Sequence, residues 1–167
     1  MRNLAALQGD GMELPKGIQR SRPLPDPGLG ALWDSIILAD SLKTQLLSQA
    51  VLNFTIRGKV SRTVLPLHGV ILLVGEPGTG KTSLARGLAH RTALAFQGGL
   101  FRLLEVEPHT LTSSAMGKTQ RAVSDLFSQA IAEAASQGPT IVLLDEVETL
   151  AADRSKMSLD ANPIDIH

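Results

Sequence analysis

Residues 75–82 limit the possible folds of this chain more than any other segment does. They read Gly-Glu-Pro-Gly-Thr-Gly-Lys-Thr and match the pattern G-x-x-x-x-G-K-[ST]. Glycines in such a run let the backbone turn sharply and bring its N–H groups close to phosphate oxygens, because no Cβ stands in the way. A buried strand is predicted directly before the run and a helix directly after it, which is the context that the motif requires. The sequence therefore predicts a phosphate-binding loop; a glycine-rich turn with an incidental lysine is the alternative.

Lys81 and Thr82 are expected to supply the charge and the metal ligand of this loop. Lys81 places a mobile cation on the β- and γ-phosphates of ATP, and the Thr82 hydroxyl is a hard oxygen ligand for Mg²⁺. The first turn of the following helix adds the positive end of its dipole. We expect ATP and Mg²⁺ as cofactors, with a cofactor-binding set made of Gly75, Glu76, Pro77, Gly78, Thr79, Gly80, Lys81, Thr82 and Ser83.

Two adjacent acids, Asp145 and Glu146, follow directly after the apolar run 140–144. In ATPases with such a loop the first acid holds Mg²⁺, and the second is placed to polarise the attacking water as a general base. Strands that run parallel end at the same edge of a sheet, where ligands of these folds bind. We therefore expect Thr82 and Asp145 as metal ligands and Glu146 and Lys81 as catalytic residues. An acid pair at a helix start is the alternative.

The rest of the chain alternates between helical and strand patterns. Apolar residues at helical spacing predict helices at 42–54 (capped by Asp40 or Ser41), 82–93 and 119–136, and apolar β-rich runs predict strands at 68–74, 101–107 and 140–144. The run at 68–74 has the pattern of a strand covered on both faces. Strands separated by helices imply an α/β fold with a parallel sheet and flanking helices.

Residues 1–30 are expected to form a flexible tail in front of this domain. They contain Pro15, Pro23, Pro25 and Pro27 together with several glycines. Such a composition is unfavourable both for a helix and for a central strand.

Composition narrows the classes of function. The chain contains no cysteine, which excludes disulfides and thiolate metal sites and suits a reducing cytosol. Its 16 basic side chains balance its 16 acidic side chains, so that the totals give no sign of a nucleic-acid partner. No apolar run approaches the length of a membrane span. We expect a cytoplasmic protein with no membrane partner.

These residues resemble the AAA+ family of ATPases, in which the phosphate loop and the acid pair are the Walker A and Walker B motifs. The resemblance covers residues 30–167 and points to the pachytene-checkpoint branch, through residues 32–37, 42–52, 75–84, 108–111 and 145–150. Members of this branch remodel HORMA-domain proteins. The resemblance implies the P-loop NTPase sheet of an AAA+ large subdomain, with residues 31–167 as a partial nucleotide-binding domain.

Members of this branch work as hexameric rings that pull a polypeptide with loops facing the pore. The matching loop would be residues 114–118, where Ala115 takes the place of the usual aromatic residue and the soft Met116 side chain could partly substitute for it. An ordinary polar loop before the following helix is the alternative. Eukaryotic members also carry a folded N-terminal domain that binds the client. Residues 1–30 are too few for one, which favours a bacterial-type member.

In the family, the sheet continues past the acid-bearing strand to a strand with a polar sensor residue, which lies between the phosphate-loop strand and the acid-bearing strand. Arginine fingers and a helical lid follow. The chain ends at His167, so we expect a C-terminally incomplete large subdomain, either a part of a longer protein or a truncated gene product. We expect these 167 residues alone to be inactive as an ATPase.

Three functions remain open from the sequence. The first is an ATP hydrolase that remodels a protein client, a HORMA-domain protein by resemblance, as a homo-oligomeric ring. The second is an ATP-binding switch or scaffold without turnover. The third, a DNA-acting AAA+ ATPase, is disfavoured by the neutral charge. Glu146 favours the first, because a binding module has no need of a second acid.

Overall fold

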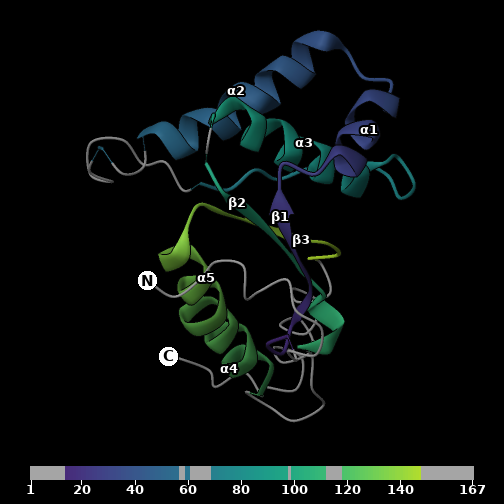
Figure 1. The fold of residues 1–167 in the computed structure, drawn as a ribbon. Helices are drawn as coiled ribbons and strands as arrows, with labels where there is room; N and C mark the ends of the chain where they lie inside the picture. The colour runs from purple at the N-terminus through teal and green to yellow at the C-terminus, as the bar shows by residue number, and fades with distance from the viewer. Residues whose placement is uncertain (1–13, 57–58, 61–68, 98, 112–117, 148–167) are drawn as a thin grey trace, which may run out of the picture.

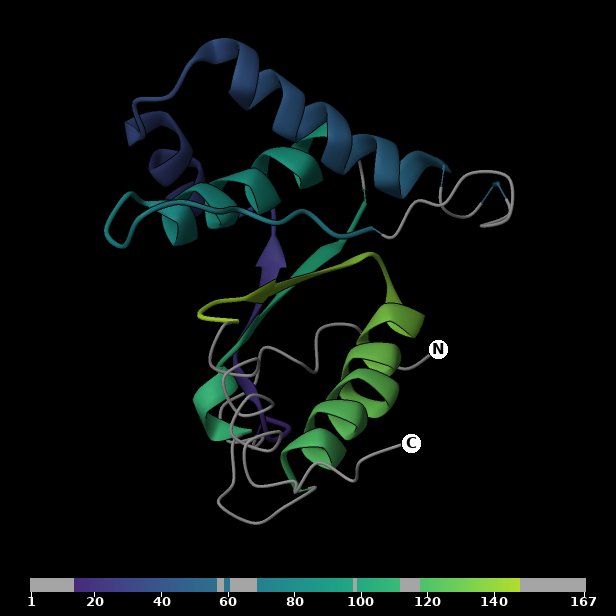
Figure 2. The same cartoon turned by 180° about the vertical axis from the view of Figure 1, so that it is seen from behind.

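The computed structural model describes residues 14–56, 59–60, 69–97, 99–111 and 118–147. Three layers are visible in two opposite views, with helices α1, α2 and α3 on one side of the sheet and a long helical segment on the other (Figures 1 and 2). The α/β fold class expected from the sequence is confirmed. In chain order the elements are β1 (Ile18–Leu24), α1 (Pro27–Ser35), α2 (Asp40–Ile56), α3 (Lys81–Ala95), β2 (Phe101–Val106), η2 (Pro108–Thr110), α4 (Lys118–Asp125), η3 (Leu126–Ile131), α5 (Ala132–Gln137) and β3 (Thr140–Leu144).

The sheet of the described residues is mixed, with the strand order β1-β2-β3. The central strand β2 pairs in parallel with β3, from Arg102 opposite Thr140 to Val106 opposite Leu144. On its other side β2 pairs antiparallel with β1. The sequence predicts a parallel sheet, which holds for the pair β2 and β3 but not for β1. The parallel pair brings the carboxyl ends of β2 and β3 to one edge of the sheet.

Strand β1 and helix α1 correct the expectation of a flexible tail for residues 18–30. A chain rich in proline can form an edge strand, because a proline there need not donate to a ladder on both sides. Pro23 stands in such a strand, opposite Arg102. Asp26 then caps α1, its Oδ1 accepting a hydrogen bond of 2.9 Å from the amide of Gly28, and Pro27 occupies the first helical turn.

A β-bulge near the start of β1 lets this strand contribute to both cores. The register shifts between Ile18 and Arg20. Since side chains alternate with a period of two, the extra residue moves Ile18 to the face opposite Leu24. Leu24 packs with α1 and α3, while Ile18 packs on the other face with Leu104, Val106 and further residues. The N-terminal strand is therefore an integral part of the packing.

Helices α1 and α3 pack so closely that a glycine is required between them. An added Cβ at Gly87 of α3 would lie 2.6 Å from the Cβ of Trp33 and 2.8 Å from its backbone nitrogen. Trp33 is itself buried, together with Leu46, Ala50 and Leu88. This contact fixes the helix that leaves the phosphate loop against the N-terminal part of the domain.

A buried carboxylate joins β1, β2 and α3. Glu105 of β2 is only 3% exposed, and the Arg86 guanidinium of α3 donates to its Oε2 at 2.7 Å and 3.2 Å. Its Oε1 has no hydrogen bond within ordinary limits, but the Nε of Arg22 in β1 lies 3.4 Å away. A buried acid needs such partners, because an unpaired buried charge is strongly destabilising.

The other face of the sheet is covered by α4, η3 and α5, which together occupy the predicted helix at 119–136. The middle part, η3, is π-helical, and Leu126 at its start is buried against Leu104 and Val106. The helix ends at Gln137, directly before Gly138 and Pro139, as the sequence predicts. No helix of the described residues has the length and apolar character that crossing a membrane requires.

The prediction of a buried strand at 68–74 is wrong for the described part, residues 69–74. This segment runs beside α3 (Figure 2), but it forms no strand and pairs with none of the three described strands. Ile71 and Leu73 pack against the cluster around Trp33. Val70, Leu72 and Val74 are 70%, 71% and 85% exposed. One face is therefore covered and the other is open, so this segment is not buried on both faces as the sequence pattern predicts.

Candidate active site

The phosphate loop has the backbone that its glycines allow. Gly78 and Gly80 have φ angles of 79° and 84°, in the left-handed region that side chains with a Cβ rarely adopt. The Thr79 hydroxyl donates to the carbonyl of Glu76 at 2.9 Å and closes the turn. Lys81 folds back over the loop, its Nζ donating to the carbonyls of Gly75 and Glu76 at 2.8 Å each.

Helix α3 begins inside the motif, and the amide groups of its first residues have no carbonyl partner within the helix. The amide of Leu84 donates to the carbonyl of Gly80 at 2.9 Å and opens the helical ladder. The amides of Lys81, Thr82 and Ser83 precede that bond, so the helix offers them no carbonyl four residues earlier. Such amides, at the positive end of a helix dipole, favour an anion. The predicted cofactor-binding set thus lies on one continuous turn and helix start.

Thr82 and Asp145 meet although they are far apart in the sequence. The Thr82 hydroxyl donates to Oδ2 of Asp145 at 2.8 Å, across a separation of 63 residues. Thr82 lies in the first turn of α3, and Asp145 directly follows β3. The structure therefore brings together the two residues predicted to bind Mg²⁺.

The geometry of this pair fits a magnesium ion. Two neighbouring ligands of an octahedral ion with Mg–O distances of about 2.0–2.1 Å lie about 2.9 Å apart. The 2.8 Å between the Thr82 and Asp145 oxygens is close to this value. Among the described residues no group of three or more His, Asp or Glu side chains could hold a metal ion. An ion at this point would take its remaining ligands from phosphate oxygens and water, as Mg²⁺ commonly does.

Glu146, the predicted general base, turns toward a different element. Its φ angle is 49°, in the left-handed region, and its amide donates to Oδ1 of Asp145 at 3.1 Å. One of its carboxylate oxygens, Oε2, lies 2.7 Å from Nε2 of His109 in η2. An ionised carboxylate can only accept, so Nε2 of His109 donates in this contact.

The pairing of His109 with Glu146 is the contact that sequence reasoning missed. His109 lies in a segment of the family resemblance, but it received no role. Part of the signal lies in the sequence, because His109 and Glu146 each follow a predicted strand, and parallel strands end at one edge of the sheet. That these two strands are direct neighbours is known only from the structure. The predicted pore-facing residues Ala115 and Met116 lie outside the described part of the chain.

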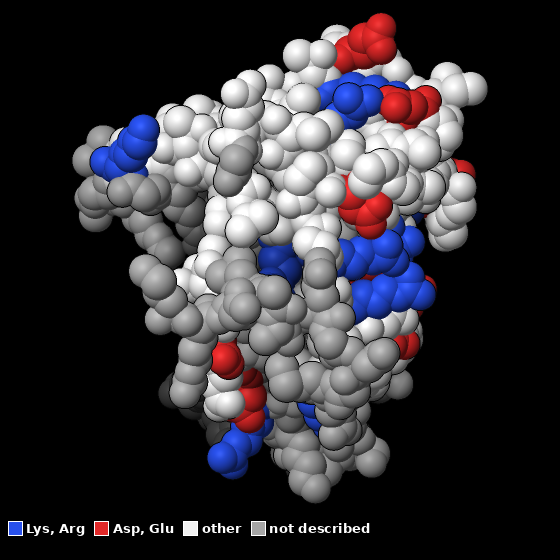
Figure 3. Space-filling view, in the orientation of Figure 1, with Lys and Arg blue, Asp and Glu red and all other residues white. Residues whose placement is uncertain are grey.

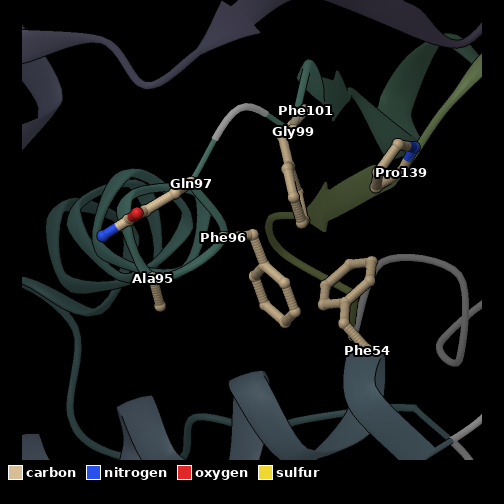
Figure 4. A pocket seen from close by; sticks show the side chains of 7 residues that line it. All are labelled: Phe54, Ala95, Phe96, Gln97, Gly99, Phe101 and Pro139. Carbon is tan, nitrogen blue, oxygen red and sulfur yellow. The ribbon is translucent and has the colours of Figure 1, made fainter.

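A cavity of about 700 Å³ lies at the other end of the sheet, where β2 and β3 begin. Figure 4 shows the rings of Phe54, Phe96 and Phe101 gathered around it, with Pro139 at its side. Phe54 meets Phe96 and Phe101 edge to face, at centroid distances of 6.1 Å and 5.0 Å. None of the lining residues has a charged side chain, so this cavity lacks a cation such as Lys81 of the phosphate loop.

Comparison with known proteins agrees with this geometry. A family model described as "ATPase family associated with various cellular activities (AAA)" matches residues 71–163, which is more than half of the chain. The chain belongs to the AAA family of ATPases. The match begins before the phosphate loop and runs past the acid pair, so it includes Lys81, Thr82, Asp145 and Glu146.

Two relatives of this AAA chain show how much of a longer protein it represents. CD-NTase-associated protein 6 of Pseudomonas aeruginosa is 77% identical over 154 residues, which are 92% of this chain and 51% of that protein. A pachytene checkpoint protein 2 homolog of Oryza sativa subsp. indica is 36% identical over 148 residues, which are 85% of this chain and 31% of that protein. The chain therefore spans about half or less of the length of these relatives.

Two solved structures share the fold of this chain. C. elegans PCH-2 superposes with a TM-score of 0.66 at 29% identity, over 83% of this chain and 37% of that one. A chain of the E. coli MS115-1 HORMA:CdnC:Trip13 complex gives a TM-score of 0.59 at 23% identity, over 76% of this chain and 46% of that one. The match to PCH-2 agrees with the pachytene-checkpoint resemblance read from the sequence.

Proposed function

We propose that this AAA chain forms the nucleotide-binding and water-activating part of an ATP hydrolase that remodels a protein client. The observation that carries the proposal is the contact of 2.8 Å between Thr82 and Asp145. It joins the helix leaving the phosphate loop to the strand bearing the acid pair. That junction is where an ATPase needs its Mg²⁺.

Each residue has a definite task in this proposal. Lys81 leaves its carbonyl partners in the loop for the β- and γ-phosphates, and the amides of residues 81–83 bind phosphate oxygens. Thr82 and Asp145 hold Mg²⁺, which would neutralise charge on the phosphates. Glu146 accepts a proton from the attacking water. Each task suits the residue type at its place in the fold.

The client we propose is a HORMA-domain protein. The sequence resembles the pachytene-checkpoint branch, and the relatives include proteins named pachytene checkpoint protein 2. One protein of the same fold was solved in a HORMA:CdnC:Trip13 complex. Residues 114–118, with Met116, are the proposed client contact, and residues 31–167 the nucleotide-binding domain.

We further propose a cytoplasmic homo-hexameric ring, in which a neighbouring subunit contributes an arginine to the ATP site. Such an arginine is worth about 10³–10⁵ in rate in related phosphoryl-transfer enzymes. The proposal concerns the whole protein, because the chain covers only 51% of its relative from P. aeruginosa. Residues 69–74 pair with none of the described strands, and turnover is expected to need a strand that pairs with them.

A DNA-acting ATPase is the weaker alternative. On the face seen in Figure 3, the described Lys and Arg side chains lie in separate groups, and several of these groups lie beside an acidic side chain. A nucleic-acid groove would instead gather basic residues along one stripe. An ATP-binding switch without turnover has one observation in its favour, the engagement of Glu146 by His109.

The substitution Glu146→Gln separates turnover from mere binding. In the full-length protein we expect unchanged ATP affinity and a turnover reduced about 10²- to 10⁴-fold, because the amide cannot accept the proton of water. Glu133→Gln, on the exposed surface of α5, is the matched control and should have parental activity. Calorimetry gives the affinity and phosphate release gives the rate. Near-parental turnover of Glu146→Gln would contradict the proposal.

A further inference from the structure

Helix α3 is tied to the sheet by two polar contacts that start about one helical turn apart. The Thr82 hydroxyl donates to Asp145, after β3, at 2.8 Å. The Arg86 guanidinium donates to Oε2 of Glu105, in β2, at 2.7 Å and 3.2 Å. Residues four positions apart lie on the same face of a helix, so both side chains leave α3 on the face that covers the sheet. One contact thus ties the helix to β3 and the other ties it to β2.

The two contacts differ in burial. The contact between Thr82 and Asp145 is exposed, so that a ligand can reach it. The Glu105 side chain, by contrast, is 4% exposed and that of Arg86 is 29% exposed. Burial strengthens a contact between charges, because little water competes for the same groups. The contact between Arg86 and Glu105 is therefore the more durable of the two.

Glu105 lies close to the proposed metal ligands along the strands. In the parallel register Glu105 is opposite Leu143, and Asp145 follows two residues later. The ladder between β2 and β3 therefore fixes the backbone of Glu105 relative to the strand end that carries Asp145. Arg86 in turn follows Thr82 by four residues on a continuous helix. The ion pair thus fixes the helix that carries one proposed Mg²⁺ ligand relative to the strand pair that carries the other.

Stability alone does not account for this ion pair. A buried ion pair can often be replaced by apolar residues of similar volume without loss of stability. The neighbouring part of the same interface is apolar, since Ala89 of α3 and Leu103 of β2 belong to one buried cluster. Oε1 of Glu105 also lacks a hydrogen bond, so the carboxylate has not regained all that it loses by leaving water. What the pair adds is direction, because charge-assisted hydrogen bonds hold two groups in a defined geometry.

Resting on the function proposed above, we propose that Arg86 and Glu105 are positioning residues that keep Thr82 and Asp145 at the separation required by Mg²⁺. The 2.8 Å between the two ligand oxygens is close to the value of about 2.9 Å for neighbouring ligands of Mg²⁺. Ca²⁺ binds oxygen at about 2.3–2.6 Å and needs roughly 3.3–3.7 Å between such neighbours. Because the ion pair holds α3 against β2, the two oxygens cannot move apart freely, and the site favours the smaller ion.

The test measures by calorimetry how much more tightly the full-length protein binds ATP with Mg²⁺ than with Ca²⁺. The double variant Arg86→Met/Glu105→Leu replaces the ion pair by apolar side chains of similar size. Its melting temperature should not fall, because apolar packing takes the place of a buried ion pair. Its preference for Mg²⁺ should fall about 10-fold, the lower end of the effect of groups that orient metal ligands. A pair that only stabilised the fold would give the opposite result, a lower melting temperature with an unchanged preference.

Two variants serve as controls. Arg91→Ala removes another arginine of α3, which pairs with Asp34 of α1 at 2.6 Å rather than with the sheet, and it should keep the parental preference. Phe101→Ala destabilises the protein without removing either member of the ion pair, and it should also keep the preference. If Phe101→Ala lowered the preference as much as the double variant does, loss of stability would explain the effect and the proposal would be wrong.

A further variant, Glu105→Gln, keeps the size of the side chain and removes its charge. It should lower the preference for Mg²⁺ as well, and it decides the question if the double variant does not fold. A parental preference in either folded variant would overturn the proposal. Equal ATP affinities with Mg²⁺ and Ca²⁺ in the parental protein would overturn it too.

Failure of this proposal can be told from failure of the proposed magnesium site. Thr82→Val and Asp145→Asn decide whether these two residues bind the metal. If neither variant changes the effect of Mg²⁺ on ATP affinity, the site itself is wrong. If both change it and the double variant keeps its preference for Mg²⁺, only the positioning role of Arg86 and Glu105 fails.

Discussion

The two ends of the parallel strand pair differ in almost every physical respect. At the amino ends of β2 and β3, Phe101 is 3% exposed and its ring meets those of Phe54 and Phe96. At the carboxyl ends, Asp145 and Glu146 are exposed and carry charge. Core packing and chemistry are therefore placed at opposite ends of the same two strands. Substitutions at one end should change stability and those at the other should change activity.

Lys81→Ala should have the largest effect at the chemical end. The variant loses the cation that faces the β- and γ-phosphates, and we expect ATP binding to fall below detection in calorimetry. The melting temperature should not fall, because the contacts of Lys81 are exposed. Lys59→Ala, which removes an exposed lysine far from the loop in sequence, is the control. Parental affinity in a folded Lys81→Ala protein would show that the phosphate site lies elsewhere.

Phe101→Ala should have the largest effect at the packing end. Removing a buried phenylalanine side chain costs about 3–5 kcal/mol of stability. Denaturant unfolding would measure this loss, and the folded fraction should bind ATP with parental affinity. Phe127, 45% exposed on η3, offers a matched control, because its truncation to alanine opens no buried cavity. If Phe101→Ala weakened ATP binding without loss of stability, the separation between the two ends would be wrong.

Gly87→Ala should destabilise the protein less than Phe101→Ala does. The new Cβ would lie 2.6 Å from the Cβ of Trp33, so α1 and α3 must move apart. Overpacking of this kind costs about 1–3 kcal/mol. We expect a lower melting temperature with ATP affinity retained. A parental melting temperature would mean that α1 is not held against α3 as described.

Local sequence patterns were sufficient for the elements whose pattern is strong. Helices α2 and α3 and strands β2 and β3 were predicted within a few residues, because apolar periodicity and the flanking glycine and proline residues are local signals. Strand β1 was missed, since its pairing with β2 is a contact across the chain that residue composition does not encode. A proline such as Pro23 is unfavourable in a central strand, but an edge strand tolerates it.

The strand expected at 68–74 failed for a related reason. Its apolar run predicts a strand, but a strand needs a neighbouring strand to share a ladder, and none of the described strands pairs with this segment. The site was predicted better than the sheet, because the motif spacing already places Thr82 and Asp145 at one edge. Their roles, and that of Glu146, remain predictions. The partner of Glu146, His109, required the parallel register of β2 and β3 to be known.

The central claim is that Thr82 and Asp145 together form the magnesium ligands of one ATP site. The most direct measurement is calorimetric ATP affinity with and without Mg²⁺, in the full-length parental protein and in the Asp145→Asn and Thr82→Val variants. We expect Mg²⁺ to tighten ATP binding in the parental protein and to have little effect in either variant, while the Mg²⁺-free affinities remain similar. If both variants kept the parental response to Mg²⁺, the metal would bind elsewhere and the claim would be wrong.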